Sequence, residues 1–287
     1  MTRALPVLTV IAAIILVWYV AAIGMNAPWA RDQAARAGTT LTTGQLIADT
    51  LSQDRPVLPA PHQVAAGLWD GIAGQKITSK RSLVYHAWVT LSATMAGFAI
   101  GSFAGILLAV GITHSRVMDQ SVMPWAVASQ TVPILAIAPM VIVVLASMGI
   151  TGLLPKAVIS AWLSFFPVLV GMVSGLRTPE AMQLDLMRSW NASRGQTFWR
   201  LRLPSSMPFL FASLKVAVAA ALVGTIVGEL PAGATSGLGA RLLSGSYYGQ
   251  TVQIWSALFM AAFLAATLVM LIGLIERVVL QRMGLAR

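Results

Sequence analysis

Residues that could carry out bond chemistry are few and scattered in this 287-residue sequence. The histidines, His62, His86 and His114, lie far apart, and neither a His-Glu-x-x-His nor a Gly-x-Ser-x-Gly pattern occurs. There is no cysteine and no lysine follows a glycine, so thiolate catalysis and the Gly-Lys-Ser/Thr core of a phosphate-binding loop are absent. Each histidine is expected to act as a hydrogen-bonding residue. We therefore predict a protein that is not an enzyme and that holds no metal or cofactor of its own.

A small set of polar residues instead stands inside or beside apolar segments. Ser129, Gln130 and Thr131 precede Pro133, which removes a backbone hydrogen bond and bends a helix. A bent helix with polar side chains can line the path of a polar solute, although the same side chains could simply bond a neighbouring helix. Glu229 is a further candidate for contact with a solute. Its alternatives are an ion pair with Arg241 or an anchoring role at the membrane interface.

The elements that must position these residues are membrane helices. Hydrophobic residues make up 57% of the chain and charged residues 10%, whereas about a quarter of a soluble protein is charged. This composition excludes a water-soluble globule. Apolar stretches with few or no charged residues, each holding the roughly 20 residues needed to cross a bilayer, predict an all-α polytopic fold with about six transmembrane helices. They run near Ala4 to Met25, Trp88 to Ile112, Val122 to Ser147, Pro155 to Leu176, Met207 to Leu230 and Val252 to Ile275.

The distribution of charge predicts the orientation of these spans. The first span is longer than the roughly 7 to 15 residues of a signal peptide's apolar core, so we expect it to be retained. Six crossings place both termini on the side of the loop 177–206, where basic residues concentrate, so this side is predicted to be cytoplasmic. On the other side, Val64 to Ile77 are expected to form a surface helix. Lys215, inside the fifth span, is expected to extend its ammonium to the interface. The formal charge of +10 fits basic loops better than a nucleic-acid partner, which is not expected.

Small residues at four-residue spacing predict close packing between the spans. Because lipid is as apolar as leucine, helices associate in it where small residues let two backbones approach. The longest such stripe comprises Gly97, Gly101, Gly105 and Ala109. Shorter ones are Gly171 with Gly175, Gly224 with Gly228, and Ala257 and Ala261 with Ala265.

The loop between the fourth and fifth spans carries strong local signals. Thr178 is a suitable N-cap for a short helix, and Asn191 can adopt the left-handed conformation that ends it. Ser193, with Gln196 three residues on, forms a capping-box pattern that predicts a second short helix ending before Pro204. The product is a basic helical elbow. It suits a docking surface, although a merely solvated loop would show the same charges.

The same loop resembles that of the membrane-spanning permease subunits of bacterial ABC importers. The family pattern is Glu-Ala-Ala, three residues, Gly, nine residues, Ile, one residue, Leu-Pro. Without a gap, it begins here at Asp185-Leu186-Met187, places its Gly at Asn191 and ends at Leu203-Pro204. Asp keeps the negative charge and Asn keeps access to the turn, whereas Leu and Met are bulkier than the two alanines. The coupling residues that the resemblance implies are Glu180, Asp185, Leu186, Met187, Asn191, Ala192, Ser193, Leu203 and Pro204.

The resemblance extends from about Tyr85 to the C-terminus and looks closest to the nitrate, sulfonate and taurine branch. Stretches that look like members for pyrimidine-type, thiamine-precursor or riboflavin uptake are Ser129 to Ile134, Phe165 to Pro167, Gly228 to Leu230 and Gly237 to Gly239. The candidates for the solute path are therefore Ser129, Gln130, Thr131, Pro133, Phe165 and Glu229.

This resemblance implies a type I ABC importer permease fold in the bacterial inner membrane. Residues 1–30 would form the first transmembrane helix, 31–86 a periplasmic segment, and 87–287 a permease core of five transmembrane helices. Two permease subunits, alike or different, would enclose the path of a small polar or heteroaromatic solute. An ABC ATPase dimer would bind ATP and Mg and dock on the loop, and a periplasmic solute-binding protein would deliver the solute.

The main alternative is a secondary transporter or channel that is not driven by ATP. Such a protein would also contain bent spans and small-residue packing. It would usually carry intramembrane acidic residues or histidines for ion coupling, or inverted repeats, and neither is clear in this sequence.

Overall fold

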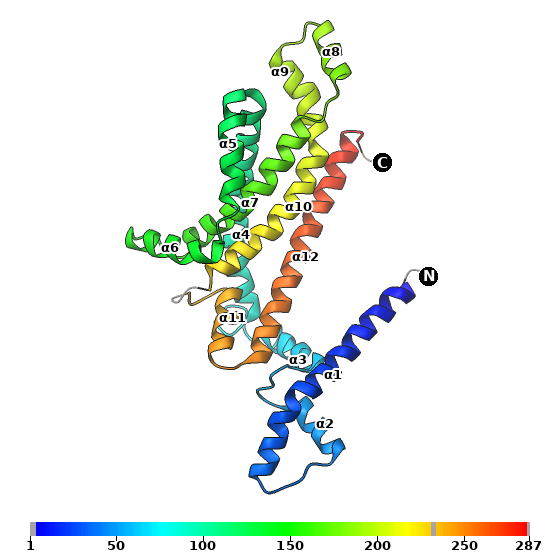
Figure 1. The fold of residues 1–287 in the computed structure, drawn as a ribbon, viewed down its shortest axis with the longest axis vertical. Coiled ribbons are helices and arrows are strands. Elements are labelled where there is room, and N and C mark those ends of the chain that lie inside the picture. The colour runs from blue at the N-terminus through cyan, green and yellow to red at the C-terminus, as the bar shows by residue number, and fades with distance from the viewer. Residues whose placement is uncertain (1–3, 231–233, 286–287) are drawn as a thin grey trace. The chain divides into compact units, whose positions relative to one another are not determined.

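The computed structural model describes residues 4–230 and 234–285, and every regular element in those ranges is a helix (Figure 1). The all-α prediction is confirmed. The helices are α1 (Ala4–Arg36), α2 (Thr43–Ser52), α3 (Pro61–Ile72), α4 (Leu83–His114), α5 (Arg116–Ser129), α6 (Ile134–Ser147), α7 (Leu153–Leu176), α8 (Ala181–Ser189), α9 (Arg194–Thr197), the π-helical turn η1 (Phe198–Arg202), α10 (Leu203–Gly228), α11 (Leu238–Tyr247) and α12 (Thr251–Arg282).

Within the described residues, five helical stretches are long and apolar enough to cross a membrane. They are Leu5–Arg36, Leu83–His114, Leu153–Leu176, Arg194–Gly228 and Thr251–Arg282. The helices α5 and α6 together are also long and apolar enough to cross, but the chain bends by 97° between them. They add a sixth span if the two are counted as one broken span. Pro133 stands at the N-cap of α6 and has no N–H group to continue the helix. The stretch Val122 to Ser147 is thus broken rather than gently bent.

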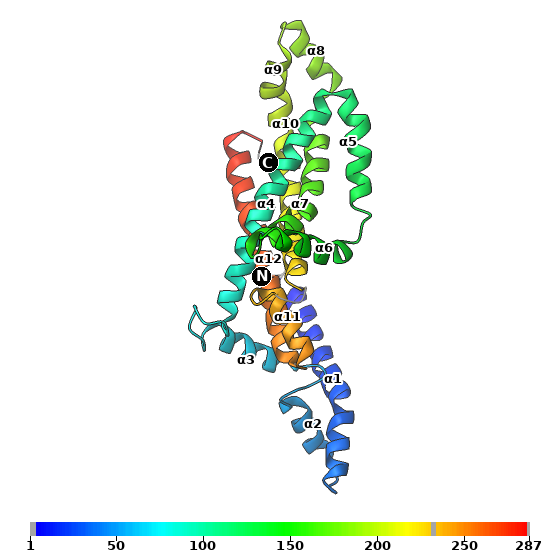
Figure 2. The same ribbon diagram turned by 90° about the vertical axis from the view of Figure 1, so that its left-hand side faces the viewer.

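The described residues of 88–230, 234–239 and 262–285 form one compact unit, in which α7 and α10 pack against each other (Figures 1 and 2). Their small residues make the contact close, since a Cβ atom on Gly224 would lie 2.9 Å from the Cα of Ser160. The hydroxyl of Ser160 donates a hydrogen bond to the carbonyl of Ala221 at 2.8 Å. The predicted pair Gly224 with Gly228 therefore faces a neighbouring helix.

The glycine stripe of α4 packs closely against a neighbouring span, as the sequence predicted, and the structure shows that this span is α7. A Cβ atom on Gly101 would lie 2.7 Å from the carbonyl oxygen of Ala161, and one on Gly105 would lie 2.7 Å from that of Phe165. These distances leave no room for a side chain, so the two backbones meet directly.

Two ion pairs link further helices of this unit. Lys215 of α10 pairs with Glu276 of α12. The sequence predicted that the ammonium of Lys215 extends to the interface, but it did not indicate this partner. Asp119 of α5 pairs with Arg177 at the end of α7, with 2.8 Å between the oxygen and the nitrogen. Lys215 and Arg177 thus each have an acidic partner on another helix of this unit.

The described residues up to 87, with residues 240–261, form the other unit. The predicted first span ends at Met25, but α1 continues to Arg36 and stops where Gly38 adopts a positive φ of 68°. Asn26 lies inside the helix, fully buried. Its amide donates to the carbonyl of Leu58 at 2.9 Å and accepts from the N–H of Val57 at 2.8 Å. This side chain therefore ties α1 to the linker before α3.

Two short helices precede α4 in the same unit. A helix is present in this region as α3, which begins at Pro61 and ends at Ile72, earlier than expected. Its place on the membrane surface stays a prediction. The sequence interpretation missed α2, although a capping box between Thr42 and Gln45 marks its start.

Candidate functional site

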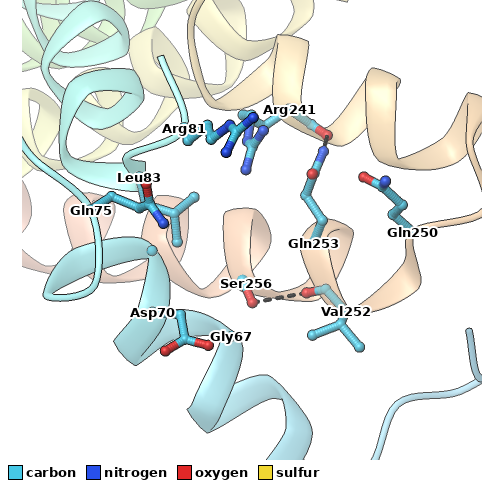
Figure 3. Close-up of a pocket in the computed structure, with 11 residues that line it drawn as sticks. Gly67, Asp70, Gln75, Arg81, Leu83, Arg241, Gln250, Val252, Gln253 and Ser256 are labelled. Carbon is cyan, nitrogen blue, oxygen red and sulfur yellow. Dashed lines mark hydrogen bonds between the residues drawn. The ribbon is translucent and has the colours of Figure 1, made fainter. Parts of the chain in front are cut away.

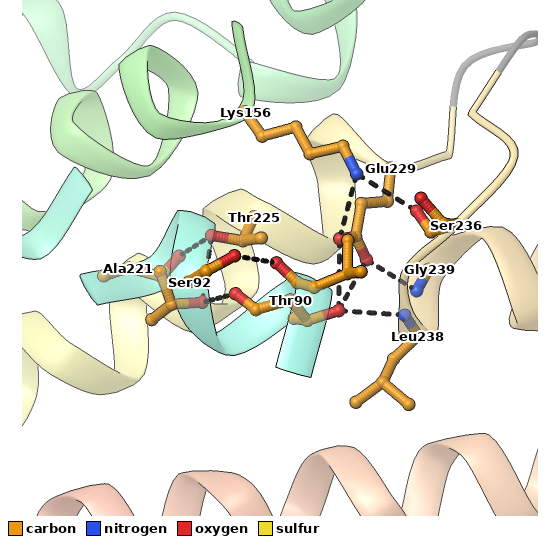
Figure 4. Close-up of polar contacts among 11 residues, drawn as sticks. Thr90, Ser92, Lys156, Ala221, Thr225, Glu229, Ser236, Leu238 and Gly239 are labelled. Carbon is orange, nitrogen blue, oxygen red and sulfur yellow. Dashed lines mark hydrogen bonds and ion pairs between the residues drawn. The ribbon is translucent and has the colours of Figure 1, made fainter. Parts of the chain in front are cut away.

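A buried polar cluster closes the end of α10 (Figure 4). Glu229, the residue after α10, is fully buried. Its carboxylate accepts hydrogen bonds from the hydroxyl of Thr90 and the N–H of Gly239, each at 2.9 Å, and pairs with the ammonium of Lys156 at 3.3 Å. Of the alternatives that the sequence left open for Glu229, an ion pair with Arg241 is not the one found, because Lys156 at the start of α7 is the partner. A buried carboxylate is costly unless it is paired and hydrogen-bonded, so the cluster must form when α4, α7 and α10 assemble.

The backbone of residues 237–239 completes this cluster. The N–H of Leu238 donates to the hydroxyl of Thr90 at 2.9 Å. Gly237 has a positive φ of 118°, and a Cβ atom there would overlap the carboxylate of Glu229. Glycine is therefore required at this position both by backbone conformation and by space. The stretches 228–230 and 237–239, which the sequence singled out separately, meet around one carboxylate.

A cavity of about 370 Å³ opens beside the cluster. This volume falls within the roughly 300–1,000 Å³ that small-ligand sites occupy. Apolar residues of α6 and α7 form part of its wall, and Thr151, Lys156, Thr235 and Ser236 add polar groups. The ammonium of Lys156 also donates to the carbonyl of Ser236 at 3.0 Å, which fixes this part of the lining.

The polar residues predicted for the solute path at Pro133 lie at the break between α5 and α6. Ser129 is buried, and its hydroxyl donates to the carbonyl of Ala126 at 2.7 Å. Gln130 donates to the hydroxyl of Ser129 at 3.3 Å, and the exposed Thr131 bonds the carbonyl of Ala128 at 2.8 Å. These bonds are local to one helix end. Contact of these residues with a solute stays a prediction.

Phe165, the remaining candidate, belongs to a hydrophobic core. It is 8% exposed and packs with Leu169 and Met172 of α7 and with Ala109 of α4. Its position beside the glycine stripe accounts for its burial, and its proposed role toward a solute stays a prediction.

The loop between α7 and α10 forms the predicted helical elbow. The first helix, α8, begins after Glu180 rather than at Thr178, because Gln183 accepts a hydrogen bond from the N–H of Glu180 at 3.1 Å. The hydroxyl of Thr178 instead donates back to the carbonyl of Ser174. Asp185 is exposed and pairs with Arg188 one turn later.

The turn of the elbow matches its sequence signals. Asn191 has a positive φ of 53°, as predicted, and the N–H of Ala192 donates to the carbonyl of Met187 at 3.0 Å. The predicted capping box is also present, since Ser193 accepts from the N–H of Gln196 at 3.3 Å and donates its own N–H to the side chain of Gln196 at 2.8 Å. The left-handed residue and the capping box together fix the angle between α8 and α9.

The prediction that the second helix of the elbow ends before Pro204 was wrong. This helix passes through the π-helical turn η1 into α10, where the N–H of Leu203 bonds the carbonyl of Phe198, five residues back. The wider turn continues the hydrogen bonding immediately before a proline that cannot donate. Leu203 and Phe198 pack against the hydrophobic core. The elbow therefore connects to α10 without a break.

One face of α8 presents large apolar side chains to the surroundings. Met182 is 74% exposed and Leu186 50%, and Trp190, the C-cap residue directly after α8, is 71% exposed. Their spacing of four residues places them on one side of this helix and its cap. No residue of α8 is buried. Leu186, the bulky departure from the family's alanine, lies in the middle of this row.

Sequence reasoning missed Lys156 and Thr90 as members of the polar cluster. Lys156 is the only charged residue between Asp119 and Arg177. A lone charge at the end of an apolar segment requires a partner in the membrane, and this requirement could have singled it out.

This fold and site define a multi-pass helical membrane protein. It has a buried ion pair where three helices meet and an exposed helical elbow between two spans. Residues 101–285 match the family described as binding-protein-dependent transport system inner membrane component. The chain belongs to this family, which comprises permease components of ABC transporters.

Several curated relatives are similar over most of the chain. The riboflavin transport system permease of Chloroflexus aurantiacus is 30% identical over 78% of this chain and 80% of its own length. The formylaminopyrimidine transport permease of Halalkalibacterium halodurans is 31% identical over 64% of this chain and 68% of its own. The nitrate import permease of Synechococcus elongatus is 24% identical over 83% and 86%. The family and branch that the sequence resembled are thereby confirmed.

Proposed function

We propose that this chain is the transmembrane permease subunit of an ATP-driven importer, and that the elbow of α8 and α9 is the surface gripped by a separate ATPase subunit on the cytoplasmic side. The observation that carries the proposal is the exposed row Met182, Leu186 and Trp190 on α8 and its cap. Large apolar side chains gathered on one helical face are typical of a surface that a partner covers.

The connection from the elbow to α10 supports a mechanical role. The elbow joins α10 through hydrogen-bonded turns, and α10 packs on α7 and ends at the buried cluster of Glu229. An ATPase dimer that closes on ATP would therefore move α7 and α10 as a rigid body and change access to the solute path. The hydrolysis belongs to the partner. A second permease subunit, alike or different, and a periplasmic solute-binding protein complete the proposed assembly.

The solute, on the same proposal, is a small polar or heteroaromatic compound. The relatives named for riboflavin, formylaminopyrimidine and nitrate transport, together with one named for aliphatic sulfonates, support this range. The cavity of about 370 Å³ beside Lys156 has a suitable size and a mixed polar and apolar lining. Mass spectrometry of small molecules extracted from the purified assembly would identify the solute.

The experiment that tests the docking role is a charge placed in the apolar row. Leu186→Glu should lower the amount of ATPase that co-purifies with the chain by about tenfold or more, because the partner must then bury a charge in place of an apolar side chain. Ala181→Glu adds the same charge to the first turn of α8 and serves as the matched control. Full retention of the ATPase by Leu186→Glu would contradict the docking role. Uptake by the chain without any ATPase would support the secondary transporter instead.

A further inference from the structure

A second cavity, of about 450 Å³, lies within the unit formed by the residues up to 87 and 240–261 (Figure 3). Its walls come from α3, from the segment between α3 and α4, from α11 and from the first turns of α12. The helices α3 and α12 pack closely at one side of the cavity, because a Cβ atom on Gly67 of α3 would lie 2.8 Å from the hydroxyl oxygen of Ser256 on α12. The same hydroxyl is already bonded to the carbonyl of Val252 at 2.8 Å.

Two guanidinium groups line this cavity side by side, those of Arg81 and Arg241 (Figure 3). Neither makes an ion pair with a residue in the described part of the chain, and the Nε atom of Arg241 is buried there without a hydrogen-bond partner. Burial lowers the pKa of Arg241 from its usual value. Asp70, the acidic residue of the lining, lies on α3, apart from the two arginines in Figure 3.

Two neighbouring guanidinium groups repel each other, and a buried N–H group without an acceptor is also unfavourable. An anion bound between the two groups would remove both costs. Guanidinium groups match the geometry of oxyanions, to which they donate paired hydrogen bonds. Gln75 lines the same cavity and can contribute a further polar contact. The amide N–H groups of Gln253 already donate to the carbonyl of Arg241 at 3.0 Å and to the hydroxyl of Ser244 at 2.9 Å, which fixes this side of the lining. The cavity thus has the charge and the donors of an oxyanion site, but the residues described around the arginines supply no oxyanion.

The position of the cavity along the chain indicates the source of that oxyanion. Leu83, which lines the cavity, is the first residue of α4, and Val252 is the second residue of α12. Both helices are membrane spans by length and composition, so the cavity lies at the level where spans meet the headgroups. Trp69, Tyr247 and Tyr248 of the same unit are each at least 70% exposed, as is typical of aromatic residues at a membrane interface.

We infer that this cavity is a binding site for a phosphate oxyanion, supplied by the headgroup of a membrane phospholipid, with Arg81 and Arg241 as the residues that hold it. A free phosphate ion has the same chemistry and is the other possible source. An acidic side chain of a docked protein is a different proposal, which the headgroup-level position of the cavity disfavours.

The test uses the full-length chain, purified in detergent with its accompanying subunits and stripped of lipid. Phosphatidylethanolamine binding is followed by native mass spectrometry, with diacylglycerol as the probe that lacks phosphate. In a second arm, thermal stability is measured in inorganic phosphate against chloride at equal ionic strength. The variants are Arg81→Gln and Arg241→Gln. Arg55→Gln is the matched control, since Arg55 is exposed in the same unit and does not line the cavity.

The expected result is that the wild type and Arg55→Gln retain phosphatidylethanolamine, whereas both cavity variants lose about tenfold in its affinity. Diacylglycerol should bind weakly to all four proteins. Stabilisation by inorganic phosphate that only the cavity variants lose would support the site with a free ion as its source. Because Arg81 is exposed, its variant tests the site even if Arg241→Gln fails to fold. Equal lipid binding and equal phosphate response in all four proteins would overturn the inference.

Discussion

The ammonium of Lys156 lies 3.3 Å from the carboxylate of Glu229, and 73 residues of chain separate the two. One stands at the start of α7 and the other follows α10, so the pair can form only when these helices are packed together. The carboxylate is fully buried, whereas 11% of the lysine side chain is exposed. The pair is consequently a marker of correct helix assembly.

Glu229→Gln should destabilise the folded chain by about 3 kcal/mol, because it leaves the lysine ammonium largely buried without its counter-ion. The check is the melting temperature of the purified chain in detergent. The double variant Lys156→Met with Glu229→Gln should recover much of the loss, since it removes both charges and keeps a side-chain oxygen to accept from Thr90 and Gly239. A melting temperature of Glu229→Gln equal to that of the wild type would show that the pair does not contribute to stability.

Gly237→Ala should be strongly destabilising. The new Cβ atom would overlap the carboxylate of Glu229, and the backbone holds a positive φ of 118°. Gly249→Ala is the matched control, because its φ is 64° and no atom lies near its Cβ position. We expect the control to lose about 1 kcal/mol from backbone strain and Gly237→Ala to lose clearly more. Equal losses, measured by thermal unfolding, would mean that contact with the carboxylate does not matter.

Gly101→Ala should separate α4 from α7, because the added carbon would lie 2.7 Å from the carbonyl oxygen of Ala161. Overpacking of this kind costs roughly 1–3 kcal/mol. In α1, Gly24 has open space at its Cβ position, so Gly24→Ala should be neutral or slightly stabilising. Thermal unfolding of both variants distinguishes packing from a general intolerance of alanine.

Asn191→Val should impair the proposed coupling, whereas Asn191→Gly should preserve it. The elbow requires a positive φ of 53° at this residue, which glycine adopts readily and a β-branched residue does not. The measurement is solute-stimulated ATP hydrolysis by the reconstituted assembly, with expression level as the control for folding. Equal coupling in both variants would show that the angle of the elbow is unimportant.

Gln130→Leu is the prediction for the solute path. It removes the polar side chain that bonds Ser129 at the break between α5 and α6. If this break faces the solute, the variant should transport solute several-fold more slowly while the ATPase still co-purifies in full. Unchanged transport would assign Gln130 to local structure alone.

The helices could be predicted well because the membrane imposes a simple rule on composition. The predicted span Pro155 to Leu176 ends at the same residue as α7, and the stripe of Gly101 and Gly105 packs against a neighbouring span as expected. Local signals also sufficed at Asn191 and Ser193, since capping and left-handed turns depend on a few adjacent residues.

Features that depend on distant residues could not be predicted in this way. The partner of Glu229 is chosen by the packing of α4, α7 and α10, and no pattern near Glu229 indicates Lys156. Asn26 seemed to end a span, but its amide groups bond the linker after α2, which lets α1 continue through it. Pro204 indicated a helix end, and only the π-helical turn before it allows the helix to continue.

That continuity has a geometric consequence. The stretch Arg194–Gly228 is one helical stretch of 35 residues, which at 1.5 Å per residue is about 52 Å long. For a rod of this length, a tilt of about 5° at the end beside Asn191 displaces the far end by roughly 4.5 Å. Gly228, at that far end, borders the cavity beside Lys156. A small rotation of this stretch about its elbow end therefore moves the wall of a pocket at the opposite end of the same span.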